Sequence, residues 1–278
     1  MPTIHSSRRR FVERHKSVEV RVRRLRFLVL VVAALLNACA GAENNRAESR
    51  TGEAIVSADL RQAAEKGDLL AQVKLGGVIV RNRALANDSE AGDWYRKAAN
   101  QPDARSAVLP LAEAGDHAAQ TVLALVHLLG NGAPKDAGEA MKWLRRAAEQ
   151  GDTVAMVGIA SLFNRGSMVP QDDVESLKWF RMAAERDSVL GQDGLGFMLV
   201  SGQGAAKDEA QAVRWFRIAA ERGYSNAQTN LAGMYREGRG VPVDLAQAMV
   251  WYQKAAAQGD VRAKEALEDF GVGIKARK

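Results

Sequence analysis

The sequence has few of the residues that mark several common protein classes. Among its 278 residues there is one cysteine, Cys39, and only 6% are aromatic. A single cysteine excludes a disulfide framework and a cysteine-based zinc domain. With 47% apolar residues, the chain is also neither collagen-like nor of low complexity.

The body of the chain also lacks an excess of positive charge, although the net charge is +6. Residues 1–38 hold nine basic and two acidic residues, whereas residues 39–278 hold 30 basic and 31 acidic residues. A nucleic-acid binder needs a cationic face on its folded part. We therefore expect no nucleic-acid partner.

Long hydrophobic runs are missing as well, because the longest, residues 27–36, has ten apolar residues. At ~1.5 Å per residue, a helix of this length covers about 15 Å, which is half of a bilayer core of roughly 30 Å. Basic residues precede the run and small residues follow it, as in a cleaved secretory signal. We assign residues 1–38 to a signal peptide.

The signal ends in Leu36-Asn37-Ala38-Cys39, which resembles the processing box of bacterial lipoproteins, although Asn37 is unusual at its position. The resemblance implies that Cys39 is acylated and anchors the mature chain to a membrane. The alternatives are an incidental cysteine or ordinary cleavage after an alanine. Residues 39–54 are predicted to form a flexible tether. Because Ala40 resembles a signal for outer-membrane sorting, we expect a location in the bacterial cell envelope, at the outer membrane facing the periplasm.

What the sequence does have is a repeat of 36 residues. Four tryptophans are spaced at this interval: Trp143, Trp179, Trp215 and Trp251. Each opens a similar phrase, from WLRRAAEQGD to WYQKAAAQGD, and Trp94 opens a fifth copy after which 13 extra residues are inserted. LAEAGD at 111–116 repeats only the end of the phrase. Such self-similarity predicts an array of equivalent structural units.

Each unit contains two predicted helices. Around Trp143, apolar residues recur at helical spacing, as at Ala140 and Ala147. This second helix follows an aspartate with Glu or Gln three residues later, which is a capping-box pattern. The cap aspartates are Asp136, Asp172, Asp208 and Asp244. The first helix, read from Leu123 and Val126, ends at a glycine suited to a left-handed C-cap. Those glycines are Gly130, Gly166, Gly202 and Gly238.

A single hairpin of two helices cannot bury its apolar face, whereas a stack of hairpins can. We therefore predict an all-α solenoid. Four full units cover residues 115–260, degenerate units with an insertion at 100–110 cover 55–114, and a capping helix and tail cover 261–278.

The units resemble the Sel1-like repeat, a relative of the tetratricopeptide repeat, as in LAGMYREGRGVPVDLAQAMVWYQKAAAQGD at 231–260. The resemblance implies a non-enzymatic scaffold for assembly or regulation, and some bacterial lipoproteins built this way serve exopolysaccharide export complexes. Cysteine-rich relatives are linked to β-lactam binding, which makes a hydrolase a third hypothesis. This chain lacks their paired cysteines and has no Ser-x-x-Lys motif.

Few residues suggest catalysis or metal binding. His117 and His127 could form a metal pair or a general base, but they are ten residues apart and have no partner cysteine nearby. The alternative is a packing role, which we favour for His127. There is no G-x-S-x-G elbow and no P-loop. We predict no catalytic residue, no metal and no cofactor.

Basic residues form a stripe along successive second helices: Lys142, Arg145, Lys178, Arg181, Arg214 and Arg217. The stripe could bind an anionic glycan, a phospholipid surface or an acidic partner. The alternative is a solvated face that is neutralised by i,i+4 pairs worth ~0.2–0.5 kcal/mol each. The predicted pairs are Arg145–Glu149, Arg181–Glu185 and Arg217–Glu221.

The inner surface of the solenoid is expected to consist mostly of first helices, where positions that differ between units would set specificity. The candidate binding residues are Val122, Asn164, Asn230 and Arg236. The leading hypothesis is a lipid-anchored adaptor that binds an envelope protein or an extended peptide on its concave face. The alternative is a module that binds polysaccharide or peptidoglycan.

Overall fold

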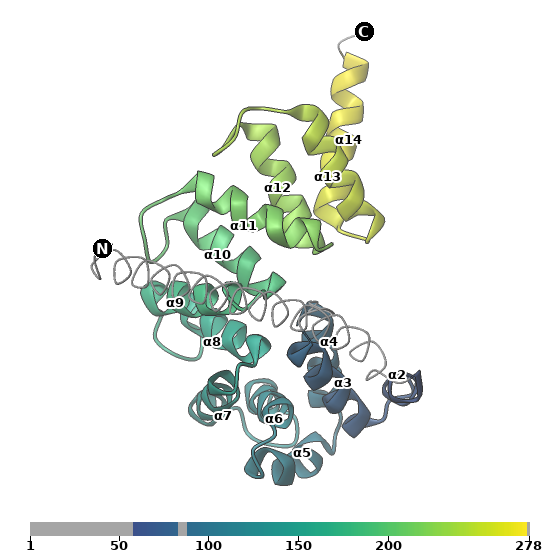
Figure 1. Cartoon of the computed structure of the whole chain (residues 1–278), viewed down its shortest axis with the longest axis vertical. Helices are drawn as coiled ribbons and strands as arrows, with labels where there is room; N and C mark the ends of the chain where they lie inside the picture. Colours follow the sequence, from purple (N-terminus) through teal and green to yellow (C-terminus); the bar gives the residue numbers. More distant parts are fainter. Residues whose placement is uncertain (1–57, 83–87, 277–278) are drawn as a thin grey trace, which may run out of the picture. The chain divides into compact units, whose positions relative to one another are not determined.

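The computed structural model describes residues 58–82 and 88–276, which form thirteen α-helices and no strand (Figure 1). The chain divides into the units Met1–Ala54 and Ile55–Lys278, and all described helices belong to the second unit. The prediction of an all-α fold is confirmed. The predicted signal peptide, Cys39 and the tether lie outside the described residues.

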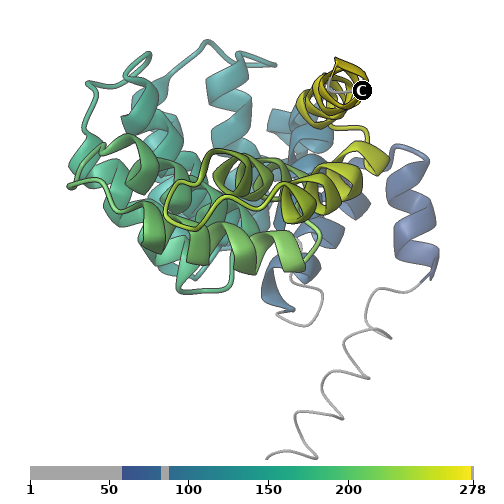
Figure 2. The same cartoon turned by 90° about the horizontal axis from the view of Figure 1, so that it is seen from above.

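The helices pair in the order that the repeat predicts, and helices that are adjacent in sequence lie side by side (Figures 1 and 2). The first helices of the five units, called A helices, are α3 (Leu69–Arg81), α6 (His117–Leu129), α8 (Thr153–Arg165), α10 (Val189–Ser201) and α12 (Ser225–Glu237). The second, or B, helices are α4 (Asp88–Ala99), α7 (Ala137–Glu149), α9 (Asp173–Ala184), α11 (Glu209–Glu221) and α13 (Leu245–Ala257). The remaining helices are α2 (Ala58–Glu65), α5 (Ala104–Glu113) and α14 (Val261–Ala276).

The helix ends lie where the sequence places them. Asp136 is the N-cap of α7, and its Oδ1 accepts a 3.0 Å hydrogen bond from the N–H of Glu139. The other three predicted caps act in the same way: Asp172, Asp208 and Asp244. The N–H of Asp136 donates to the carbonyl of His127 at 3.1 Å, so it does not need the return bond of a full capping box. The glycines that end the A helices have φ between 62° and 81°: Gly130, Gly166, Gly202 and Gly238.

Stacking of the units buries an apolar seam. Trp143 is buried, whereas Trp179 is half-buried and packs against the two apolar clusters on either side of it. Trp251 links the next two clusters in the same way. The small residues Ala147 and Ala148 are buried beside Trp143, and residues of this size let helices approach closely. The predicted solenoid of stacked hairpins is therefore confirmed.

The insertion adds a second helix of the B type. Helix α5, which ends in the phrase LAEAGD, packs against α6. Across this contact the buried Gln120 Nε2 donates to the carbonyl of Ala112 at 3.1 Å. The same bond joins Gln228 to Ala220 at 3.1 Å, between α12 and its preceding B helix. Helix α5 thus takes the place of a B helix before α6, and α3 and α4 of the preceding hairpin contact α6 as well.

Candidate interaction surface

Helix α4 lies across several A helices, because it contacts α6, α8 and α10. Gly92 marks the contact: a Cβ built there would lie 3.8 Å from Val154 Cγ1 of α8 and 4.0 Å from Leu190 Cδ1 of α10. Both distances are ordinary van der Waals contacts, so a residue as small as glycine or alanine at this position lets α4 approach both helices. Asp193 and Phe197 follow Leu190 on the same face of α10 by helical spacing. We call the face that includes Val154, Leu190, Asp193 and Phe197 the inner surface.

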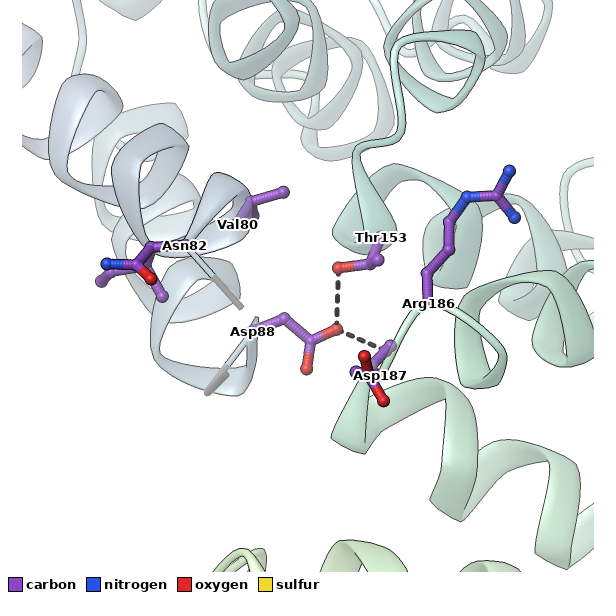
Figure 3. A pocket seen from close by; sticks show the side chains of 8 residues that line it. Val80, Asn82, Asp88, Thr153, Arg186 and Asp187 are labelled. Atoms are coloured by element: carbon purple, nitrogen blue, oxygen red, sulfur yellow. Dashed lines mark hydrogen bonds between the residues drawn. The ribbon is translucent and has the colours of Figure 1, made fainter. Parts of the chain in front are cut away.

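The start of α4 is held against this surface by a carboxylate. Asp88 Oδ2 accepts hydrogen bonds from the hydroxyls of Thr153, at 3.0 Å, and Ser188. Its Oδ1 accepts from the N–H groups of Val189, at 3.1 Å, and Leu190, at 3.4 Å. Figure 3 shows the side chain reaching across from the α3–α4 hairpin to Thr153. A negative charge at the N-terminus of a helix is favourable, so Asp88 acts as a cap for α10 from 100 residues away.

The junction before α10 differs from the other units in a way that suits this contact. Ser188 stands where Asp116 and Asp152 cap α6 and α8, and its hydroxyl accepts from the N–H of Gly191 at 2.7 Å. A second carboxylate at this point would repel Asp88. Asp187 has φ of 65° at the turn where other units have glycine, a conformation that aspartate tolerates better than most residues.

A small pocket adjoins the Asp88 contact and is lined by residues of both sides, including Ile79, Asn82 and Asp187. Its volume of about 20 Å³ has room for roughly one water molecule, so it is not a site for an organic substrate. Burial raises the pKa of Asp88 above its ordinary value, against the hydrogen bonds from Ser188 and Thr153 that lower it. Burial of the charged carboxylate therefore costs desolvation free energy, which the hydrogen bonds offset only in part.

A second buried carboxylate, Asp152, joins α4 to α6 and α8. Its Oδ1 accepts from the N–H of Ala155 at 3.0 Å. Its Oδ2 accepts from the hydroxyls of Tyr95, at 3.2 Å, and Thr121, at 3.0 Å, and lies 2.9 Å from His117 Nδ1. Burial, together with the negative charge of Asp152, raises the pKa of Tyr95 well above its usual value. This network is fully enclosed, so it positions helices and offers no group to a substrate.

The two candidate histidines have separate environments. His117 is buried and belongs to the Asp152 network. His127 is half-buried, and its Nδ1 has no hydrogen-bond partner. In the part of the chain that the structure describes, no group of three or more His, Cys, Asp or Glu side chains could hold a metal ion. The sequence did not reveal the role of His117, because its partner Asp152 is 35 residues away.

Beyond α4, the inner surface is open. Asp193 accepts one hydrogen bond, from Asn230 Nδ2 of α12 at 2.7 Å, and burial raises its pKa to about 6. Asn226, which is half-buried, donates to the Tyr224 hydroxyl at 2.9 Å. Phe197 is 53% exposed, although aromatic residues of this size are usually covered. This open part therefore combines a carboxylate, amides and an apolar ring.

The sixth position of α6, α8 and α10 is not part of the inner surface, which corrects one of our expectations. Val122 is fully buried. At the same position of α8, a Cβ added to Gly158 would lie 3.3 Å from Leu144, and Gly194 of α10 faces Phe180 of α9. Gly158 and Gly194 thus leave room for Leu144 and Phe180 of the preceding B helices, and Val122 is enclosed in the core, so packing decides these positions. Val122 is therefore wrong as a candidate binding residue.

The other candidate binding residues lie nearer the surface. Asn164 is half-buried, and its Nδ2 lies 3.4 Å from the sulfur of Met198. Asn230 is half-buried and joins the open part through Asp193. Arg236 is exposed, lies 5.9 Å from the ring centre of Tyr252 and donates to Glu237. Of the predicted residues, the structure thus brings only Asn230 to the open inner surface, and the sequence analysis missed Asp193 and Phe197.

The basic stripe is neutralised differently from our prediction. The three predicted i,i+4 pairs are absent from the ion pairs of the described helices. Lys142 and Lys178 instead form ion pairs with the glutamates three residues before them, Glu139 and Glu175. The distance between Lys178 Nζ and Glu175 Oε1 is 3.0 Å. Arg217 donates to the hydroxyl of Tyr235 at 2.9 Å. None of the helices in the described ranges is long and apolar enough to cross a bilayer.

Comparison with known proteins places this geometry among known repeats. The family model described as Sel1 repeat matches residues 69–103, 117–152, 153–188, 189–224 and 225–260. No curated protein sequence matches the chain.

Two solved structures are similar in fold and sequence. One is c5321, a protective antigen of uropathogenic Escherichia coli strains that displays an SLR fold, with 32% identity and a TM-score of 0.52 over 73% of this chain and 41% of that chain. The other is a Sel1 repeat protein from Oxalobacter formigenes, with 30% identity and a TM-score of 0.53 over 76% of this chain and 68% of that chain. The chain thus spans less than half of the length of c5321.

Proposed function

Because the chain belongs to the Sel1 repeat family, we propose that it is a lipid-anchored adaptor of the bacterial cell envelope that binds a protein partner on its inner surface. Sel1 repeat proteins typically mediate protein–protein interactions as non-catalytic scaffolds. Rigid helices suit this role, because a preformed surface loses little conformational entropy when it binds.

The observation that carries the proposal is that the inner surface already holds a helix and then continues uncovered. Helix α4 occupies the part formed by Val154 and Leu190. Farther along the same face Phe197 is 53% exposed, and the half-buried Asp193 accepts a single hydrogen bond, from Asn230. A carboxylate beside an exposed ring is suited to a segment that offers both a hydrogen-bond donor and an apolar side chain.

A photo-crosslinking amino acid in place of Phe197 tests this surface in the native envelope. We expect crosslinks to one or a few proteins. The matched control is Val174 on α9, which is 64% exposed and lies on a B helix. If Val174 captures the same proteins as Phe197, or if neither position captures any, the inner surface is not the binding site.

The lipid anchor is supported by the Leu36-Asn37-Ala38-Cys39 box and by the short apolar run before it. Its test is mass spectrometry of the mature N-terminus, where we expect an acylated Cys39. Cys39→Ser should release the chain from the membrane fraction. An unmodified chain that starts elsewhere would refute the anchor but leave the binding surface untouched.

Binding of an anionic glycan is the second candidate, and one observation favours it. Arg145 and Arg181 form no ion pair with Glu149 and Glu185 on the described helices, whereas Lys142 and Lys178 are paired with Glu139 and Glu175, so the arginines of the stripe keep their charge available. Such binding would weaken steeply with salt and with Arg181→Ala. If a charged polysaccharide binds equally well to this variant, the stripe has no such role.

A further inference from the structure

We propose that the open inner surface recognises an arginine of the protein partner: the carboxylate of Asp193 pairs with the guanidinium group, and the ring of Phe197 stacks on it. This inference rests on the proposed function and names the residue type that the surface selects. It concerns the specificity of the surface, whereas the crosslinking test asks only whether a protein binds there.

The carboxylate of Asp193 replaces a pair of residues that serves the fold in another unit. In α6, Thr121 donates to Asp152, the N-cap of the next A helix, at 3.0 Å. The corresponding residues of the α10 unit are Asp193 and Tyr224. Tyr224 precedes α12 without a side-chain bond to that helix. The unit has therefore lost a side-chain cap and gained a carboxylate on the inner surface, an exchange that fold stability does not explain.

The charge of Asp193 is not neutralised within the described part of the chain, where it forms no ion pair. Its Oδ1 accepts from Asn230, and its second oxygen accepts no hydrogen bond from the described residues. Arg262 of α14 donates instead to Asn226, at 3.1 Å, and to Asp260, at 3.2 Å. Burial raises the pKa of Asp193 to about 6, although Asn230 and Arg262 lower it. A cation from another protein would compensate this charge.

Phe197 places an aromatic ring one helical turn from this carboxylate. Residues four positions apart lie on the same face of a helix, with Cβ atoms about 5–6 Å apart, and Phe197 is 53% exposed. The corresponding residue of α12 is Gly233, where a built Cβ would have only the Tyr252 hydroxyl within 4 Å, at 3.7 Å. At that position α12 therefore has no side chain that could cover the ring.

Arginine suits this pair of groups, because its planar guanidinium donates to a carboxylate and also stacks on an aromatic ring. Lysine offers the charge without the plane, and a neutral donor offers no charge. The pair is specific to α10: α6 has Thr121 and Leu125 at these two positions, and α8 has Val157 and Ser161. We therefore expect the partner to place its arginine at α10 and not at the equivalent positions of α6 or α8.

Selection of peptides tests this chemistry. The probe is a phage library of random nonapeptides without Asp, Glu or His, selected on the immobilised, detergent-solubilised full chain. We expect the selected peptides to share an arginine. The most enriched peptide is then synthesised with arginine and with citrulline, a neutral analogue of the same shape. Citrulline should weaken binding to the wild type at least about tenfold, because the charge pair is lost.

Variants of the chain assign the effect to the two side chains. Asp193→Asn should weaken binding of the arginine peptide at least about tenfold and make the two peptides bind equally. Phe197→Leu, which keeps an apolar side chain but removes the ring, should weaken it about threefold. The matched control is Asp208→Asn, whose carboxyl is exposed and caps α11; it should bind as the wild type does.

The pH dependence of binding gives a readout that a purely structural role of Asp193 would not change. Arg262 and Tyr224 are the charged and titratable groups near Asp193 on α14 and before α12, and burial raises the pKa of Tyr224 to about 12. Neither changes its charge between pH ~5 and ~7.5. Binding of the arginine peptide should weaken about tenfold over this interval as the pH falls, because Asp193 takes up a proton. Asp193→Asn, which keeps Asp88 of α4, should show no such change.

Several outcomes would overturn the proposal. Selected peptides that share no arginine, or that bind Asp193→Asn as tightly as the wild type, would show that the carboxylate is not the recognised group. Lysine peptides that bind as well as arginine peptides would refute stacking on Phe197. If Asp193→Asn fails to fold, the citrulline comparison on the wild type and on Phe197→Leu decides. Crosslinks at position 197 that persist with Asp193→Asn would refute this inference and keep the proposed function.

Discussion

The covered and the open parts of the inner surface differ in how their carboxylates are satisfied. Under α4, Asp88 accepts four hydrogen bonds, and Asp152 has four hydrogen-bonding partners. On the open part, Asp193 accepts one, from Asn230. Buried polar groups are stable only when they are hydrogen-bonded. On the covered part, residues of the same chain supply all of the hydrogen bonds that Asp88 and Asp152 make. The open part holds a half-buried carboxylate with fewer hydrogen bonds than the two carboxylates of the covered part.

The largest expected difference in unfolding free energy is between two variants that each remove an aromatic side chain, one from the covered part and one from the open part. Tyr95→Ala should destabilise the chain by about 3–5 kcal/mol, because it empties a fully buried site beside Gly76. Phe197→Ala should cost less than about 0.5 kcal/mol, because the ring is mostly exposed. Urea denaturation followed by circular dichroism measures both. Similar losses would erase the distinction between the covered and the open part.

Removing a carboxylate is the second test. Asp152→Ala should cost about 3 kcal/mol, because it removes a helix cap and leaves the buried hydroxyls of Tyr95 and Thr121 without their acceptor. Asp208→Ala is the matched control, since Asp208 is exposed and caps α11 with one hydrogen bond; it should cost about 1 kcal/mol. If the two losses are equal, the Asp152 network adds nothing to its role as a cap.

A third test changes the junction that receives Asp88. Ser188→Asp should destabilise the chain by about 2 kcal/mol, because a second carboxylate would adjoin the buried Asp88. The reverse exchange in another unit, Asp116→Ser, should cost less than about 0.5 kcal/mol, because both residues are good N-caps. Thermal unfolding of both variants checks the pair. A neutral Ser188→Asp would mean that α4 does not need this serine.

The smallest expected effect is a pH dependence on the open part. Burial raises the pKa of Asp193 from 3.8 to about 6, so the folded state binds the proton more tightly than the unfolded state. Its stabilising contribution is therefore full below the unfolded pKa and is lost as pH rises through about 6. Compared with Asp193→Asn, the wild type should lose about 1 kcal/mol of stability over this interval, because solvent still reaches the half-buried carboxyl. Denaturation at several pH values tests this, and parallel curves for the two proteins would contradict it.

Local patterns predicted much of the fold and little of the site. The cap aspartates and the terminal glycines, such as Asp136 and Gly130, act within a few residues of their position, so their spacing was sufficient. Val122 was misassigned because it is enclosed in the core by residues of neighbouring helices. Of the candidate binding residues, only Asn230 lies on the open inner surface, and Asp193, its partner, is 37 residues away.

The sequence by itself determined the two-helix unit, its period and its ends, because these depend on hydrogen bonds and apolar contacts between residues close in the chain. Only the tertiary structure decided that α4 crosses to α8 and α10, where Asp88 meets residues 100 positions away. Helix α5, which the insertion forms, packs against α6 in the place that a B helix holds in the later units. A repeat pattern contains only the features that all units share. The difference between the covered and the open parts of the inner surface comes from the α3–α4 unit, which departs from that pattern.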